Sequence, residues 1–147
     1  MGYQWFIRGY DPGSFDARDC PQAASPTTTS CPAFDRLVGS RIGVFNAELR
    51  IPLFGTEEFG LFNLPFVPTE ISPFFDAGAA WMSASQPNGK LRLAFDRNAL
   101  DRVPVFSTGV SARFNVLGYA VLEAYYAHPY QRPGRNWLWG FQLAPGW

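Results

Sequence analysis

Few side chains in this sequence are of the types that carry out acid–base or nucleophilic chemistry. The candidates are two carboxylates as general acid or base, two serines as nucleophiles and the one histidine as their partner: Asp76, Glu123, Ser107, Ser111 and His128. Neither serine lies in a Gly-x-Ser-x-Gly turn, and His128 precedes a proline at the end of a predicted strand. The pattern therefore disfavours a catalytic triad, and we predict no enzymatic activity and no cofactor.

The two cysteines flank a segment rich in Pro, Ala, Ser and Thr, which is predicted to be a flexible loop. A disulfide between Cys20 and Cys31 would close this loop, would contribute on the order of 2–3 kcal/mol and would require an oxidising compartment. Two free cysteines are the alternative. No metal site is expected, because His128 is distant in sequence and no acidic cluster accompanies the cysteines.

The composition is unusual for a soluble domain. Aromatic residues make up 17% of the 147 residues and charged residues only 16%, whereas a soluble domain carries roughly 25% charged residues. The net charge of zero offers no electrostatic case for nucleic-acid binding. Mean hydropathy is −0.09, and no apolar run approaches the roughly 20 residues that a membrane helix needs. Residues 1–6 lack the pattern of a secretory signal, so export information lies upstream or the protein is not exported.

The elements that would position these side chains are strands with two different faces. In the last segment the apolar residues occupy every second position, namely Trp137, Trp139, Phe141, Leu143 and, at the end, Trp147. This alternation is typical of the last strand of an outer-membrane β-barrel. Similar alternation predicts strands over 43–53, 70–82, 106–115 and 119–128, all antiparallel. In the first of them the odd positions, such as Phe45 and Leu49, are predicted to face lipid.

The predicted connections differ greatly in length. Residues 11–38 and 83–104 are long and polar, whereas 116–118 form a tight turn. Bacterial barrels have short turns on the periplasmic side and long loops outside. The connections therefore favour an antiparallel transmembrane β-barrel with long extracellular loops.

Four motifs in order resemble the carboxyl-terminal part of the bacterial surface antigen superfamily, the barrels of the BamA and TamA type. Ile7–Tyr10 matches the Val-Arg-Gly-Phe/Tyr motif of the loop that folds into the barrel, and 46–53 (Asn-Ala-Glu-Leu-Arg-Ile-Pro-Leu) matches the strand that follows it. Phe75–Gly78 matches the Phe-x-Asp-x-Gly strand, and Ser107–Arg113 matches the Ser-x-Gly-x-x-x-Arg strand.

The resemblance implies that residues 1–38 form this motif loop and residues 39–147 form the last five strands of a barrel of about sixteen, so that the chain is expected to be a fragment. It implies location in the outer membrane of a Gram-negative-type bacterium. The implied role is insertion or translocation of proteins there, or anchoring of an upstream domain. The expected partners are outer-membrane lipid, client outer-membrane or secreted proteins and assembly partners.

The resemblance also assigns roles to single residues. In the motif Arg8-Gly9-Tyr10, Arg8 is expected to pair with Asp76 and Glu48 on the inner wall of the barrel. A planar guanidinium can bind carboxylates with two parallel hydrogen bonds and stays charged in partly buried sites. Trp147 stands where the family has a terminal phenylalanine, and Pro145 departs from the family because it removes a backbone donor from the last strand.

A soluble all-β binding module is the competing interpretation. One face of each strand would then be buried in a sandwich core or would form an aromatic ligand platform, and the sequence would show the same alternation. Such a core would have to enclose several tryptophans and many phenylalanines in a small chain.

Overall fold

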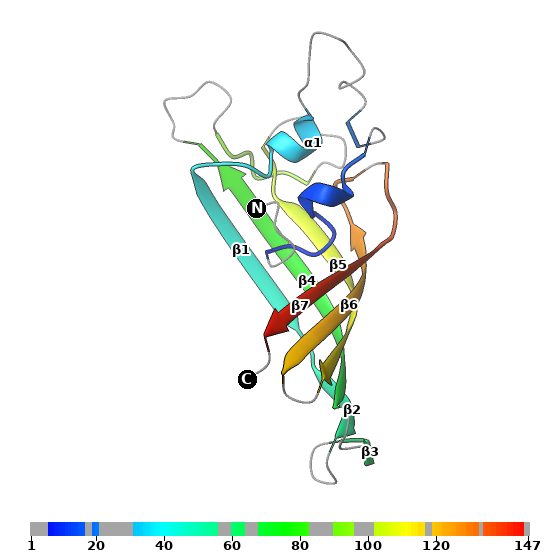
Figure 1. The fold of residues 1–147 in the computed structure, drawn as a ribbon. Helices are drawn as coiled ribbons and strands as arrows, with labels where there is room; N and C mark the ends of the chain where they lie inside the picture. The colour runs from blue at the N-terminus through cyan, green and yellow to red at the C-terminus, as the bar shows by residue number, and fades with distance from the viewer. Residues whose placement is uncertain are drawn as a thin grey trace.

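The structure is a computed structural model that describes residues 6–16, 19–20, 31–55, 60–63, 68–82, 90–95, 102–116, 119–132 and 134–145. Figure 1 shows a single sheet, with only two short helices in the described part. The prediction of an all-β fold is confirmed. The elements are η1 (Pro12–Ser14), α1 (Pro32–Asp35), β1 (Arg41–Glu48), β2 (Ile51–Gly55), β3 (Phe62–Asn63), β4 (Thr69–Trp81), β5 (Val105–Val116), β6 (Ala120–Pro129) and β7 (Leu138–Pro145).

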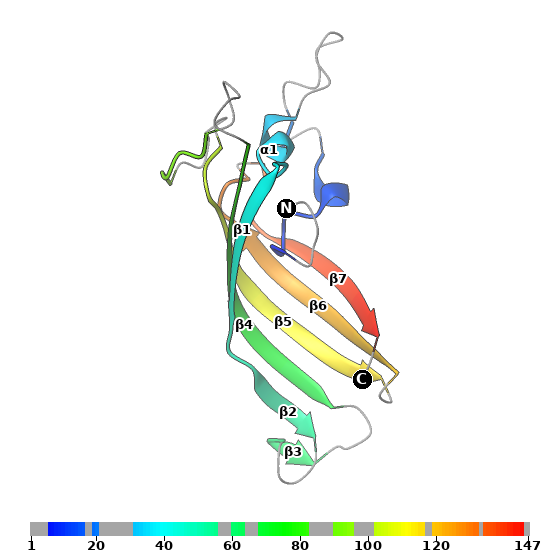
Figure 2. The same ribbon diagram turned by 90° about the vertical axis from the view of Figure 1, so that its left-hand side faces the viewer.

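The strands lie in the order β3-β2-β4-β5-β6-β7, and β1 also pairs with β4. β1 lies along one half of β4, with Arg41 opposite Trp81, and β2 lies along the other half, with Ile51 opposite Ile71. The sheet is open in the described part of the chain, because β7 pairs only with β6 there. Figures 1 and 2 show a curved sheet, with the N-terminal segment and α1 gathered at the end where β1 begins.

The prediction of one continuous strand over 43–53 is wrong. The structure divides it into β1 and β2 at residues 49–50, and the register with β4 shifts between Pro52 and Phe54. At the break, Leu49 N–H donates to the Pro73 carbonyl of β4 at 3.1 Å, but Pro73 has no N–H to donate in return. The register shift follows Pro52, which also has no N–H for the ladder.

The prediction that the strands are antiparallel throughout is also wrong, because β2 and the two-residue β3 run parallel. The chain after β2 folds back onto it, and Leu61 N–H donates to the Pro52 carbonyl at 3.3 Å. A side chain at Gly60 would lie 2.6 Å from the Gly55 nitrogen, so only glycine permits this approach. The other pairs in the sheet are antiparallel.

The two faces of the sheet differ in what covers them. Along β4, Ser72, Phe74 and Asp76 are buried, whereas Pro73 and Phe75 between them are exposed. The buried side carries the N-terminal segment, and we call it the inner face and the opposite side the outer face. Residues opposite one another in the ladders share a face, so this division extends from β1 to β7.

The N-terminal segment packs on the inner face through its own apolar side chains. We call the described residues 6–16, 19–20 and 31–38 the cap. Ile7, Tyr10 and Leu37 of the cap form a buried cluster with Ala80 of β4 and Val105 of β5. Phe15 and Phe34 pack against this cluster with their rings edge to face, 5.5 Å apart. Burial of these apolar side chains fixes the cap against the strands that carry the candidate site.

Candidate functional site

Arg8 is a buried residue of the cap and is bound by Asp76 of β4. Its side chain donates two parallel hydrogen bonds to the carboxylate, from Nε to Oδ2 and from Nη2 to Oδ1, each 2.9 Å long. Its main-chain N–H donates a third, 3.1 Å long, to Oδ2. Arg8 is 4% exposed and Asp76 is fully buried. The predicted pair of Arg8 with Asp76 is present, in the bidentate form that a guanidinium makes best.

Two further carboxylates converge on the same guanidinium. Nη1 of Arg8 lies 2.8 Å from Glu48 Oε1 and 3.0 Å from Glu123 Oε1, so β1, β4 and β6 each contribute one carboxylate. The guanidinium carbon also lies 3.6 Å from the centre of the Phe74 ring, which provides a cation–π contact. Glu48 was predicted as a partner, whereas the prediction did not include Glu123 in this role.

Arg113 of β5 connects the carboxylates to one another. It donates from Nη2 to Glu48 at 2.9 Å and from Nε to Glu123 at 2.8 Å. Gln142 of β7 donates to Glu123 at 2.7 Å, and Asn46 of β1 donates to Asp76 at 2.8 Å. A buried charge is costly unless it is paired and hydrogen-bonded. The hydrogen bonds from Arg113, Gln142 and Asn46 therefore help three carboxylates to lie together under the cap.

The charge state of Arg8 follows from this environment. Burial by itself would lower the pKa of Arg8, but the hydrogen bonds and charges of Asp76, Glu48 and Glu123 outweigh that effect and raise the pKa. Arg8 therefore stays charged, and the network holds the cap by charge-assisted hydrogen bonds.

Gly9 and Tyr10 complete the motif and have different roles. Gly9 has a φ of 90°, a backbone conformation that other residues adopt only with strain, so this turn favours glycine although there is room for an added carbon. The Tyr10 hydroxyl donates to Gln131 Oε1 at 3.1 Å, and it accepts from the main-chain N–H of Gln131, also at 3.1 Å. The motif thus contacts both the strands and the connection after β6.

Two aromatic rings on the inner face lie across glycines of the neighbouring strand. A side chain at Gly109 would lie 2.8 Å from the Phe74 ring, and one at Gly140 would lie 2.0 Å from the Tyr125 ring. Phe74 therefore lies between the Arg8 guanidinium and β5. The flat rings leave room above them for the cap.

Asp11 of the cap accepts a hydrogen bond from the Tyr125 hydroxyl. Burial raises the pKa of Asp11, against smaller opposing effects of this hydrogen bond and of the Arg132 charge. Its other oxygen, Oδ1, is buried without a partner. The buried charge of Asp11 is therefore less well compensated by hydrogen bonds and opposite charges than the charges of the carboxylates around Arg8.

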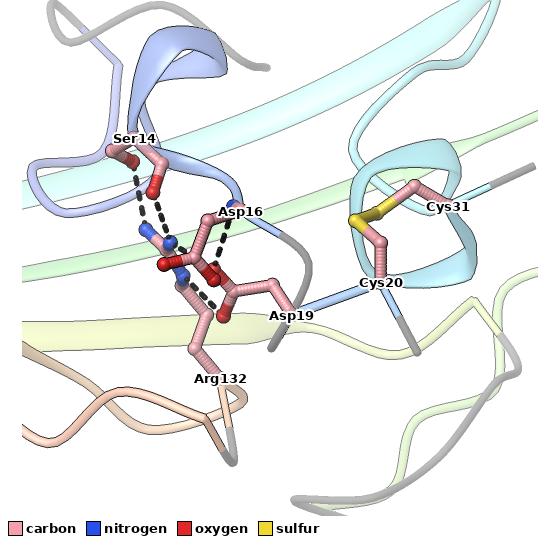
Figure 3. Close-up of a disulfide and its surroundings, with 6 residues drawn as sticks. All are labelled: Ser14, Asp16, Asp19, Cys20, Cys31 and Arg132. Atoms are coloured by element: carbon pink, nitrogen blue, oxygen red, sulfur yellow. Dashed lines mark hydrogen bonds and ion pairs between the residues drawn. A yellow bond between two sulfur atoms is a disulfide. The ribbon is translucent and has the colours of Figure 1, made fainter. Parts of the chain in front are cut away.

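Cys20 and Cys31 form the predicted disulfide beside α1 (Figure 3). It joins the described part of the cap up to Cys20, which we call the first arm, to residues 31–38, which we call the second arm. Trp147, the predicted terminal aromatic, lies outside the described residues.

The structure does not bring the candidate catalytic residues together. Ser107 and Ser111 are buried on the inner face. His128 is opposite Thr108 in the β5–β6 ladder and contacts the rings of Tyr130 and Trp137, which places it on the outer face. Glu123 and Asp76 are engaged by arginines.

Sequence reasoning included Arg113 only as part of a motif and left out Gln142. The ladder places Arg113 opposite Glu123 and Glu123 opposite Gln142, so a row of polar side chains crosses β5, β6 and β7. Correct pairing of the predicted strands by their inner-face positions would have revealed this row.

No family model, curated protein or solved structure matches this chain. Within the described residues, neither helix has the length and apolar character needed to cross a membrane.

Proposed function

We propose that this chain belongs to an integral outer-membrane β-barrel of the surface antigen and assembly-factor type. Such a barrel inserts or translocates proteins at the outer membrane, or anchors an upstream domain there. Outer-membrane lipid and client proteins are the corresponding partners.

The segregation of charge between the two faces of the sheet is the observation that carries this proposal. Of the charged side chains on the described strands, those on the inner face are Glu48, Glu70, Asp76, Arg113 and Glu123. Arg41, at the first position of β1, shares the outer face with Trp81. The sheet therefore has a charged interior and an apolar exterior, the reverse of a soluble fold and the expected pattern of a membrane barrel.

The outer face is apolar over the width of the sheet. Phe45 of β1, Val110 of β5 and Trp139 of β7 are 61%, 49% and 67% exposed. Other exposed members are Leu49, Ile51, Phe75, Leu122, Tyr126, Phe141 and Leu143. A soluble monomer rarely exposes an apolar patch larger than a few hundred Å². Lipid is the environment that makes such a face favourable.

Aromatic rings form a continuous band on this face near the cap. Successive ring centres lie 4.6 to 6.5 Å apart, and the band extends from β1 to β7. Aromatic residues collect at the head-group level of membrane proteins, so the band supports a membrane interface at this height. The rings belong to Phe45, Phe75, Phe95, Phe106, Tyr126, His128, Tyr130, Trp137 and Trp139.

The open edges of the sheet need partners in a bilayer. Unpaired backbone N–H and C=O groups are too costly in hydrocarbon, so the proposal requires further strands to pair with β1 and β7. A barrel of about sixteen strands, as the family resemblance implies, would supply them. In that barrel Arg8 would hold the motif loop against the inner wall and would help to keep the strands in register.

The test is membrane fractionation of the full-length protein together with heat-dependent gel migration. The proposal expects the protein in the outer membrane and a compact band only in unheated samples. Full-length protein that stays in the soluble fraction would overturn it. A soluble, monomeric and cooperatively folded product of residues 1–147 alone would favour the binding-module alternative.

A further inference from the structure

A second arginine, Arg132 in the connection between β6 and β7, is directed into the cap. Its side chain is fully buried. Nη1 donates to the Gly9 carbonyl at 2.7 Å and to Ser14 Oγ at 2.8 Å, and Nη2 donates to the Ser14 carbonyl at 2.8 Å. Nε and Nη2 bind the two carboxylate oxygens of Asp19 at 3.2 and 2.6 Å (Figure 3). Thus all five N–H groups of this guanidinium have acceptors.

The ion pair within this cluster is completely removed from solvent. The side chains of Arg132 and Asp19 are both 0% exposed, and the Phe15 ring covers the guanidinium at 4.1 Å. Removing one partner of such a pair leaves an uncompensated buried charge, which is strongly destabilising locally. Arg135, three residues later, binds Asp16 at 2.6 Å, but both side chains are more than one third exposed. Exposed ion pairs of this kind contribute little to stability. A substitution of Arg135 is therefore a matched control for the loss of the buried pair of Arg132.

Arg132 and Arg8 act in opposite directions and on different partners. Arg8 extends from the cap to carboxylates of β1, β4 and β6, whereas Arg132 extends from the β6–β7 connection to Gly9, Ser14 and Asp19 of the cap. No side-chain partner is common to the hydrogen bonds and ion pairs described for the two guanidinium groups. We propose that Arg132 is a second anchor of the cap, which holds residues 9–16 and Asp19 on the inner face independently of Arg8.

The connection between β6 and β7 also holds the second arm of the cap, residues 31–38. Arg36, which follows α1, donates through Nη2 to the carbonyl of Gln131. The disulfide joins Cys20 of the first arm to Cys31 of the second. The two arms of the cap are therefore joined to each other and are both bound to the connection between β6 and β7. Under the proposed function, on which this consequence rests, displacement of the cap from the barrel interior requires release of both arginines.

Hydrogen–deuterium exchange of the full-length protein, in detergent or lipid, tests the second anchor. Opening of the cap raises exchange in residues 9–19 without raising it in β4 and β5. We expect Arg132→Ala to speed exchange in residues 9–19 by at least about tenfold, and Arg135→Ala by less than about twofold. With Arg8→Ala alone these residues stay protected, and the Arg8→Ala/Arg132→Ala double variant loses protection throughout the cap.

Two variants keep the test decisive if Arg132→Ala does not fold. Arg132→Lys retains the charge but has three donors instead of five, and Asp19→Asn removes the partner charge, so both are expected to give intermediate exchange. Unchanged exchange in residues 9–19, release of these residues by Arg8→Ala alone, or an equal rise in β4 and β5 would overturn the proposal. These readouts do not depend on membrane fractionation, so failure of the anchor and failure of the proposed function are distinguishable.

Discussion

Arg8 and Asp76, 68 positions apart in the sequence, are joined by two parallel side-chain hydrogen bonds of 2.9 Å and by a third bond from the Arg8 main chain. Both residues are buried, so each depends on the other for compensation of its charge. This pair connects the cap to the centre of the inner face.

Exchange of charge at this pair gives the first prediction. Arg8→Ala or Asp76→Ala should each lower the free energy of unfolding by about 3–5 kcal/mol, because a buried charge is left without its partner. The double variant Arg8→Asp/Asp76→Arg should recover part of the lost stability and function. Recovery stays incomplete, because a carboxylate at position 8 would be repelled by Glu48 and Glu123. Asp76 also accepts the residue 8 main-chain N–H and a bond from Asn46, which arginine at that position cannot accept. Denaturant titration and a functional assay of the full-length protein measure both effects, and a double variant no better than the single ones would argue against direct pairing.

Gly109 supports Arg8 through the Phe74 ring. Gly109→Ala should displace this ring and shift the adjacent β6 backbone, since the added carbon would lie 2.8 Å from the ring and 2.1 Å from the Tyr126 carbonyl oxygen. The expected cost is about 1–3 kcal/mol, as for other overpacked sites. Gly43→Ala on β1 is the control, because its new carbon would meet only Trp81 at 3.7 Å. The two unfolding midpoints measure the difference, and equal midpoints would show that the close approach at Gly109 is unimportant.

Reduction of the disulfide should loosen the cap. The Cys20–Cys31 bond closes a loop with a sequence separation of 11, for which chain entropy gives about 2–3 kcal/mol. We expect dithiothreitol to lower the unfolding midpoint of the wild-type protein by a corresponding amount. The Cys20→Ser/Cys31→Ser variant should already have the lower midpoint and should not respond to reductant. A wild-type midpoint that reductant leaves unchanged would contradict the prediction.

Asp11 should make stability depend on pH. Burial raises its pKa above the ordinary 3.8, so the folded state binds this proton more tightly than the unfolded state does. The favourable contribution of Asp11 to the free energy of unfolding is therefore fully present below pH 3.8, and it is lost as the pH rises through the raised pKa of the folded state. Asp11→Asn keeps an acceptor for Tyr125 without the charge, so we expect equal or higher stability than wild type at pH 7. Unfolding measured at pH 4 and pH 7 tests this, and a variant markedly less stable at pH 7 would show that the charge is favourable.

Neighbouring positions on β7 test the proposed lipid-facing surface. Phe141 is 64% exposed on the outer face, whereas Gln142 beside it contacts Glu123 on the inner face. Phe141→Arg should lower the fraction of full-length protein folded into outer-membrane lipid, because an arginine on the lipid face costs up to about 2–4 kcal/mol, most at the bilayer midplane and less toward the interfaces. Gln142→Arg should be tolerated, since Glu123 can pair with it. If both variants insert equally well, the outer face does not contact lipid.

The sequence by itself determined the strands and the division of their faces. Alternation in 70–82 and 106–115 predicted β4 and β5 to within one residue at each end, and Asp76 lies on the inner face, as expected for it. This was possible because side-chain direction in a strand depends only on local backbone geometry, with a period of two.

The family resemblance implied the pairs of Arg8 with Asp76 and Glu48, but only the tertiary structure decided which other distant groups meet. Glu123 and Asp76 meet only at Arg8, because the ladders place Asp76 opposite Ser107 and Glu123 opposite Arg113. Arg132 enters the cap because the connection after β6 folds toward Ser14 and Asp19. The parallel pair of β2 with β3 likewise depends on a close approach at Gly60. Residue types and local periodicity carry no information on such contacts, because they arise from the summed registers of several strands and from the path of the cap over them.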